Sequence, residues 1–208
     1  TATMYPASKT IKTELFPVID KDGFAKPAIL VHVEELISAG IEHIVIVVNN
    51  DDLAYFERLF HEPDTLENFN KLPKHCQIYA KKILAMGEKV EFVVQEKQEG
   101  FGHALLCARD LIGDEPFLLM IGHHLYRAPE NSPSVAAQML AAYSRHRNSI
   151  VGLKTTPLED VCWFGTVGGV WMAGEGPDSD RDIMNTSCSS LVEAALEDIG
   201  LAQYKDVF

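Results

Sequence analysis

The chain predicts an α/β fold with a mainly parallel sheet flanked by helices, and three observations support this prediction. Two continuous apolar runs, at 43–48 and 117–121, have the composition of strands buried on both faces, as parallel strands usually are. A third apolar run covers 90–95 and ends in the amide Gln95. Stretches with apolar residues at helical spacing separate these runs, and strands that alternate with helices are typical of a parallel sheet.

The residues before the first of these strands predict an extended piece, a turn and a helix. The extended piece covers 15–20, and the Lys-Asp-Gly sequence at 21–23 is a turn signal. Pro27 suits the first turn of the following helix, and Gly40 suits its end. The sequence therefore predicts a first helix between these two residues.

Helical spacing of apolar residues also predicts the later helices. They are expected over 51–60, 74–86, 103–111, 134–147 and 189–199. The segment 62–72 is rich in Pro, Asp and Asn, which indicates an irregular surface insertion. The composition of 149–154 predicts a strand, and 163–171 alternates large residues with glycine, as a kinked strand does.

Length and charge limit the organisation and the partners of the chain. Its 208 residues suffice for one large domain with an appendage, and we expect an α/β domain over 1–186 and a helical appendage over 187–208. The formal net charge of −12 argues against general binding to nucleic acid or to an anionic membrane. A local pocket can still bind one anionic small molecule.

The four cysteines and the hydropathy pattern indicate the compartment. No two cysteines have C-x-x-C spacing, which predicts reduced thiols and argues against a zinc site. No apolar run has the length of a membrane span, and no signal-peptide pattern is present. We therefore expect a cytoplasmic protein.

Polar residues follow the predicted strands at their carboxyl ends, where open α/β sheets bind ligands. Gln95 carries both a donor and an acceptor, so it can read one edge of a nucleobase. Gly100 and Gly102 form a loop where a flat base can approach the backbone, and His103 opens a helix whose N–H groups can face an anion. Spacing alone is better explained by an ordinary turn between a strand and a helix, because short motifs match by chance.

Two histidines and a lysine are further candidates. His123 and His124 follow the predicted strand at 117–121, and imidazole can ligate a transition metal or contact a phosphate. The competing interpretation is a pair of loop histidines without a ligand. Lys12 lies in a polar segment and can neutralise a phosphate, although charged loop residues are more often simply solvated.

In combination, these segments resemble the sugar-1-phosphate nucleotidylyltransferases. They are most similar to the bacterial type of UTP–glucose-1-phosphate uridylyltransferase. The resemblance covers residues 4 to about 171. Gln95, Gly100 and the Gly-His-Ala at 102–104 resemble the pattern Q-x-x-x-x-G-x-G-H-A-x-x-C-A. The Phe-Gly-Thr-Val at 164–167 resembles the step that lies along the sugar.

This resemblance implies a Rossmann-like fold of the nucleotide-diphospho-sugar transferase type, and a reaction. Glucose 1-phosphate attacks the α-phosphorus of UTP, and the products are UDP-glucose and pyrophosphate. By the same resemblance, Gln95 and Gly100 hold the uracil, while Gly165 and Thr166 lie along the sugar. The remaining nucleotide-binding residues would be Gly102, His103 and His123. Mg²⁺ is the expected cofactor, with His123 at the metal position, and a homo-oligomer is one expected assembly.

Three departures from the family pattern affect the charges of that reaction. The sequence contains no G-x-G-T-R loop for the triphosphate, Thr13 stands at the position of the catalytic lysine, and His123 replaces the metal-binding aspartate. Lys12, beside Thr13, is the remaining candidate for the catalytic lysine. Three hypotheses stay open: an enzyme or its remnant, a non-catalytic module that binds a nucleotide or sugar nucleotide, and an inactive fragment of a longer enzyme.

The last residues do not resemble this family. The segment 191–208 resembles the start of a sterile alpha motif domain. The spacing of its apolar residues is equally consistent with one amphipathic helix that packs on the sheet. Both interpretations remain open.

Overall fold

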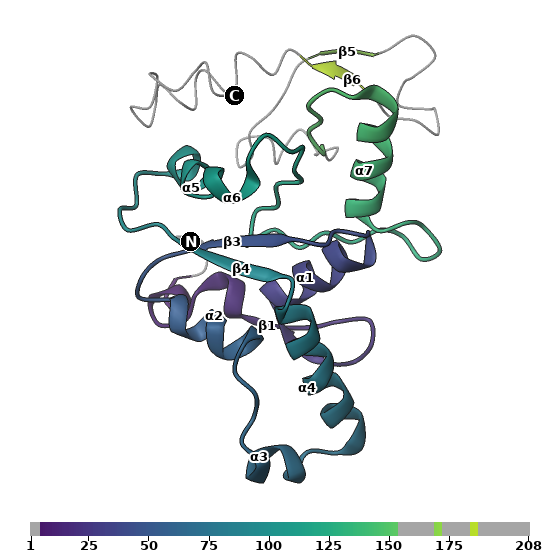
Figure 1. The fold of residues 1–208 in the computed structure, drawn as a ribbon. Coiled ribbons are helices and arrows are strands. Elements are labelled where there is room, and N and C mark those ends of the chain that lie inside the picture. The colour runs from purple at the N-terminus through teal and green to yellow at the C-terminus, as the bar shows by residue number, and fades with distance from the viewer. Residues whose placement is uncertain (1–4, 154–168, 172–183, 187–208) are drawn as a thin grey trace. The chain divides into compact units, whose positions relative to one another are not determined.

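A computed structural model describes residues 5–153, 169–171 and 184–186 of the chain (Figure 1). The chain divides into two compact units. The first consists of 1–98 and 105–152, and the second of 99–104 and 153–208. No helix in the described ranges is long and apolar enough to cross a membrane.

The first unit opens with short turns and a hairpin. Two 3₁₀ turns, η2 (Ala7–Lys9) and η3 (Thr13–Leu15), precede the strands β1 (Pro17–Ile19) and β2 (Ala25–Pro27). These strands pair antiparallel, and Gly23 in their turn has a φ of 82°, a conformation that favours glycine. The predicted extended piece and turn are confirmed.

A parallel strand pair forms the centre of the first unit. It consists of β3 (Ile44–Val48) and β4 (Val90–Val94), which pair in register over their whole length. Helices α1 (Ala28–Ser38), α2 (Leu53–Phe60) and α4 (Lys74–Gly87) lie on one side of this pair (Figure 1). The predicted strands at 43–48 and 90–95 and the three helices are therefore confirmed, with ends shifted by one or two residues.

The hydrophobic core lies between this pair and its helices. The buried members of the core come from three helices, both strands and the start of α7 (Val135–His146). They are Ile29, Leu30, Val33, Leu36, Ile44, Val48, Phe56, Phe60, Met86, Val90 and Ala136. At the end of α4, a Cβ on Gly87 would collide with the Phe60 carbonyl, so glycine permits the close approach of α4 to α2.

Two capped helices show how local chemistry sets helix ends. Ser134 accepts a hydrogen bond from the Ala137 N–H at 3.2 Å and so begins α7, as the sequence predicts. Thr65 caps α3 (Leu66–Lys71) in the same way, through the Asn68 N–H at 3.3 Å. The prediction that 62–72 is irregular throughout is therefore wrong, because the Thr65 cap starts a short helix there.

The predicted strand at 117–121 is wrong. No ladder joins this segment to another strand among the described residues. Leu118 and Met120 pack against the core, whereas Phe117 and Leu119 are 54% and 46% exposed. The run is apolar without being buried on both faces. The prediction of a strand at 149–154 also fails over the described residues 149–153. The mainly parallel sheet is represented in the described ranges by the β3–β4 pair alone.

The predicted helix at 103–111 is two helices. These are α5 (Phe101–Cys107), which belongs partly to each unit, and α6 (Arg109–Ile112). The helix starts earlier than predicted because the Ala104 N–H donates to the Gly100 carbonyl at 3.1 Å. Ala108 lies between the two helices, and Gly113, with a φ of 62°, ends the second.

The second unit contains one antiparallel strand pair in its described part. It consists of β5 (Gly169–Trp171) and β6 (Met184–Thr186). The strand β5 is the end of the predicted strand at 163–171, and the rest of that strand lies outside the described residues. The predicted helix at 189–199 and the appendage over 187–208 lie outside them too, so the predicted domain division stays a prediction.

Candidate functional site

Polar residues gather where β3 and β4 end, as the sequence predicts. The Gln95 N–H donates to the Val48 carbonyl at 2.8 Å, which extends the strand pairing by one step. Gln95 directly follows Val94, the last residue of β4, and is half-buried. Its backbone is fixed by the sheet, as a base-reading amide requires.

Three further polar residues lie at the end of β3, and one of them, Asp52, pairs with Lys12. The Asn49 amide donates to Asp52 Oδ2 at 2.7 Å, and its oxygen accepts from Gln98 Nε2 at 3.1 Å. The Lys12 ammonium lies 3.0 Å from the same Asp52 oxygen. We call these four residues the Asp52 network. Sequence reasoning identified Lys12 and missed the other three, although the polar run at 49–52 directly after a buried strand was a usable signal.

Asp52 is a buried charge at the start of α2. The residue is 8% exposed, and a carboxylate in such a place needs compensating partners. Lys12 and Asn49 supply them. The Lys12 side chain remains 45% exposed, so solvent or a ligand can still reach its ammonium group.

The η3 turn places Thr13 and Glu14 differently from Lys12. The Thr13 hydroxyl is buried without a hydrogen-bond partner among the described residues, and it brings no charge to the site. Glu14 lies against Gly122, where an added Cβ would come within 2.7 Å of Glu14 Cγ. Gly122 therefore lets the turn that carries His123 approach the η3 turn.

Three histidines lie at this turn. The rings of His123 and His124 are 4.5 Å apart, edge to face, and both residues are exposed. Partial burial, with the neighbouring His124, lowers the pKa of His123 and favours its neutral form. His32, 3% exposed, lies 3.1 Å from the Gly122 carbonyl through Nε2, and burial lowers its pKa. A neutral His32 therefore donates its Nε2–H and fixes the backbone before His123.

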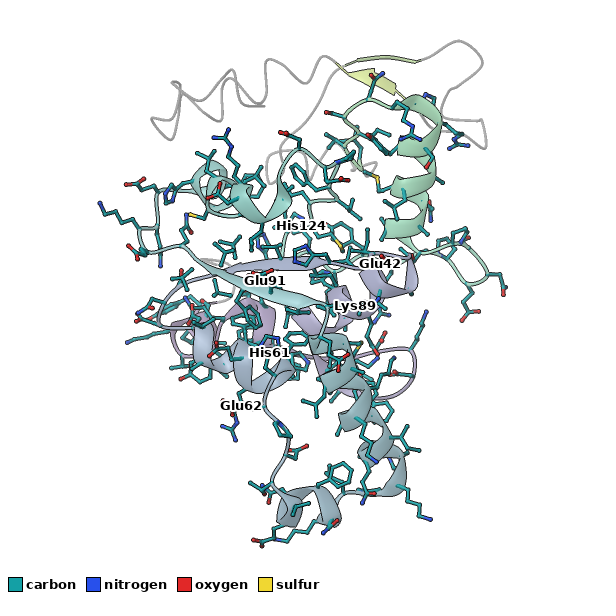
Figure 2. The ribbon with its side chains drawn as sticks, in the orientation of Figure 1. Glu42, His61, Glu62, Lys89, Glu91 and His124 are labelled. Carbon is teal, nitrogen blue, oxygen red and sulfur yellow. The ribbon has the colours of Figure 1, made fainter. Side chains whose placement is uncertain are left out.

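Another histidine lies on the other side of the strand pair. Figure 2 shows His61 and His124 on opposite sides of β3 and β4. His61 Nε2 lies 3.1 Å from the carbonyls of both Gly87 and Val90. These contacts give His61 a structural role in closing the end of α4 onto β4.

The donors around His123 are a poor fit for Mg²⁺. Two are imidazoles, whereas Mg²⁺ prefers oxygen ligands in octahedral geometry. The Glu14 carboxylate is the oxygen group beside Gly122. No group of three possible metal ligands converges at this turn among the described residues. The expectation of a magnesium cofactor stays a prediction.

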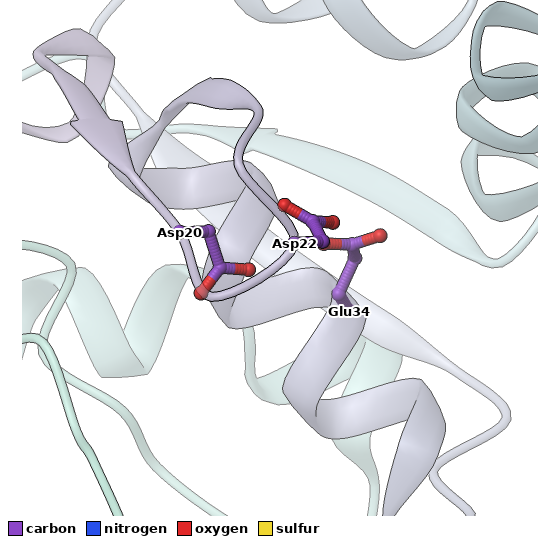
Figure 3. Close-up of side chains that lie close together, drawn as sticks. All are labelled: Asp20, Asp22 and Glu34. Atoms are coloured by element: carbon purple, nitrogen blue, oxygen red, sulfur yellow. The ribbon is translucent and has the colours of Figure 1, made fainter. Parts of the chain in front are cut away.

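Three carboxylates do converge elsewhere in the first unit. Figure 3 shows Asp20 and Asp22 of the hairpin and Glu34 of α1, whose oxygens lie within 4.8 Å of one another. The Lys26 ammonium, 2% exposed, lies 2.7 Å from Asp20, 2.5 Å from Asp22 and 2.6 Å from Glu34. The position that a metal ion would take is therefore occupied by an ammonium group.

The Lys26 cluster, made of these four residues, is electrostatically coupled. Burial alone would raise the pKa of Asp20 and of Asp22, but hydrogen bonds from Lys26 and from backbone N–H groups lower both values. Burial would likewise lower the pKa of Lys26, and the three carboxylates raise it instead. Tyr79 packs beside the cluster, where burial and the charge of Glu34 raise its pKa to about 12.

The remaining predicted site residues belong to the second unit. Gly100 has a φ of 99°, which favours glycine, and Gly102 is buried. His103 Nε2 lies 3.7 Å from a Glu99 carboxylate oxygen. The predicted sugar residues Gly165 and Thr166 lie outside the described residues.

Comparison with known proteins defines the class of the chain. The model of the nucleotidyl transferase family matches residues 2–168, and the chain belongs to this family. It is 30% identical over 162 residues to UTP–glucose-1-phosphate uridylyltransferase of Bacillus subtilis, covering 78% of this chain and 53% of that protein. It is 29% identical over 165 residues to the Staphylococcus epidermidis protein of the same name, covering 78% and 54%. The chain thus spans about half the length of the curated relatives it matches.

Solved structures agree with this family and with the predicted fold. A UDP-glucose pyrophosphorylase in complex with UDP-glucose matches with a TM-score of 0.66 and 32% identity, over 82% of this chain and 60% of that one. The UDP-glucose pyrophosphorylase of Acinetobacter baumannii matches with a TM-score of 0.65 and 25% identity, over 85% and 59%. The predicted resemblance and the nucleotide-diphospho-sugar transferase type of α/β fold are confirmed.

Proposed function

We propose that the chain binds uridine nucleotides and acts as a uridylyltransferase on UTP and glucose 1-phosphate. The observation that carries this proposal is the position of Gln95, which the β3–β4 pair fixes at the edge where such folds bind ligands. Relatives named for this activity align with the chain over most of its length. In the proposed reaction a sugar-phosphate oxygen bonds to the α-phosphorus of UTP, the bond from that phosphorus to the bridging oxygen breaks, and pyrophosphate leaves.

The residues of the chain would divide this work. The Gln95 amide would read the uracil edge. Lys12 would donate to the phosphates, since its exposed ammonium has donors beyond those that Asp52 uses. Positioning and neutralisation of charge supply most of the catalysis in reactions of this type.

A second candidate function is a non-catalytic uridine-nucleotide-binding module. It is favoured by Thr13 and His123, which stand where the family pattern has a lysine and an aspartate. It is also favoured by Lys12, whose charge is already paired with Asp52. Losing one preorganised charge at a site of this type commonly costs about 3–4 kcal/mol of transition-state stabilisation.

One experiment tests both candidates. Thermal melts of the full chain with UTP, dTTP and ATP, each with and without Mg²⁺, measure whether a ligand stabilises the native state by mass action. We expect UTP to raise the midpoint most, and Gln95→Ala to abolish this selectivity. Glu67→Gln, a substitution on the exposed α3, is the matched control.

Pyrophosphate release from UTP and glucose 1-phosphate then separates the candidates. Release that requires Lys12 supports the enzyme. Binding without release supports the module. Equal shifts with UTP and ATP would refute both candidates, and an unchanged response of Gln95→Ala would refute the assignment of Gln95.

A further inference from the structure

The Asp52 network holds a carboxylate at the end of β3 that the family pattern does not account for. Asp52 Oδ2 accepts from Asn49 at 2.7 Å and from Lys12 at 3.0 Å, and Gln98 binds the other end of the Asn49 amide. Asp52 is 8% exposed, while the Lys12 side chain is 45% exposed. The carboxylate is therefore the fixed member of the ion pair, and Lys12 is the member that can reorient.

The charges of the surrounding segments are unfavourable for a highly charged anion. The η3 turn with Lys12, the segment 49–52 and the segment 95–98 together carry two lysines and four carboxylates. The lysines are Lys12 and Lys97, and the carboxylates are Glu14, Asp51, Asp52 and Glu96. The lowered pKa of His123 keeps that ring from adding a positive charge at neutral pH. A ligand at this edge of the sheet would therefore have to share the Lys12 ammonium with Asp52.

We propose that Asp52 sets the charge preference of this site, so that the chain binds a uridine diphosphate sugar more tightly than UTP. This inference rests on the proposed binding of uridine nucleotides. At neutral pH a diphosphate sugar carries about two negative charges and UTP about four. While the Lys12 ammonium stays paired with Asp52, its remaining N–H groups can donate to a diphosphate. Its charge is already neutralised by Asp52, so it cannot compensate the charge of a third phosphate.

The size of the effect follows from Coulomb's law. Two extra ligand charges at about 8 Å from the Asp52 carboxylate, with water between them, change the affinity by roughly fivefold. Asp52→Asn removes the charge and keeps the shape of the side chain. We therefore expect Asp52→Asn to strengthen UTP binding roughly fivefold relative to UDP-glucose.

The experiment is a calorimetric titration of the full chain with UTP and with UDP-glucose in a metal-free buffer. Wild type is expected to prefer UDP-glucose, and Asp52→Asn to reduce or reverse that preference. In the Lys12→Met background the Asp52→Asn change should keep its effect on the ratio, since the repulsion between the Asp52 carboxylate and the ligand does not need the ammonium. Asp64→Asn, an exposed carboxylate between α2 and α3, is the matched control and should leave the ratio unchanged.

A salt series on the wild-type protein keeps the test independent of how well Asp52→Asn folds. If charge repulsion causes the preference for UDP-glucose, raising the salt from about 0.02 M to about 0.5 M must shrink it. A folded Asp52→Asn with an unchanged ratio overturns the inference, as does wild type that binds UTP more tightly or a preference insensitive to salt. Wild type that does not distinguish uridine from adenosine nucleotides overturns the proposed function as well, and the comparison with ATP identifies that case.

Discussion

Removing the ammonium of Lys26 should destabilise the fold more than any other single change of charge in the hairpin region. Lys26 is 2% exposed and binds three carboxylates within 2.7 Å. Lys26→Met keeps most of the side-chain volume and leaves those carboxylates facing one another. Breaking a buried ion pair from one side costs about 3–5 kcal/mol. Asp22 is 40% exposed and Glu34 keeps its contact with Lys82, so the lower end of that range, about 3 kcal/mol, is expected.

Urea denaturation followed by far-ultraviolet circular dichroism measures this loss. With a slope of about 2 kcal/mol/M, the midpoint should fall by roughly 1.5 M while the slope stays constant. The matched control is Lys71→Met, which breaks an exposed pair with Glu67 and should cost at most about 0.5 kcal/mol. If the two variants shift the midpoint equally, the Lys26 cluster contributes no more than a surface pair and the reasoning is refuted.

The Lys26→Met variant should also change how the free energy of unfolding depends on pH in acid. The folded pKa values of Asp20 and Asp22 lie below their ordinary value of 3.8. The stability they contribute is therefore fully present above that pH and is lost as the pH falls through the folded values. Because the hydrogen bond from Lys26 is the largest of the causes that lower both pKa values, the free energy of unfolding of Lys26→Met should depend less on pH below 3.8 than that of wild type.

Three more predictions concern single contacts. Ser134→Ala removes the cap of α7 and should lower the free energy of unfolding by about 0.5–2 kcal/mol, whereas Ser134→Asp should preserve most of it. Gly122→Ala forces a Cβ against Glu14 and should lower the free energy of unfolding by about 1–3 kcal/mol, and an unchanged free energy of unfolding would contradict this reasoning. His32 has a lowered pKa in the folded protein, so its contribution is present above 6.5 and is lost as the pH falls below that value. His32→Gln should flatten the dependence of the melting temperature on pH below 6.5, and an unchanged profile would place the titrating group elsewhere.

The sequence predicted those parts of the fold that depend on local patterns. The runs that became β3 and β4, and the spacing that became α1, α2 and α4, are read from neighbours along the chain. The segment 117–121 shows the limit of this approach. Its composition is that of a buried strand, yet Phe117 and Leu119 are exposed, because burial depends on which segments pack beside it.

The candidate site was predictable only at its strand ends. Gln95 stands where its place after an apolar run indicates. The pairing of Lys12 with Asp52 joins residues forty positions apart, and no spacing rule connects them. Likewise, no local pattern around Lys26 predicts that this residue is buried. It becomes buried because the hairpin turn brings Asp20 and Asp22 to the side of Glu34.

The Asn49 side chain fixes which groups donate and which accept in the hydrogen bonds of the Asp52 network. Its NH₂ group must face the Asp52 carboxylate, which can only accept, so its oxygen must face Gln98. Gln98 in turn donates through its own NH₂ group, which turns its carbonyl oxygen away from Asn49. One negative charge at the start of α2 thus sets the orientation of two successive amides. The side-chain oxygen of Gln98, in the segment that follows β4, is therefore oriented as an acceptor for an N–H group.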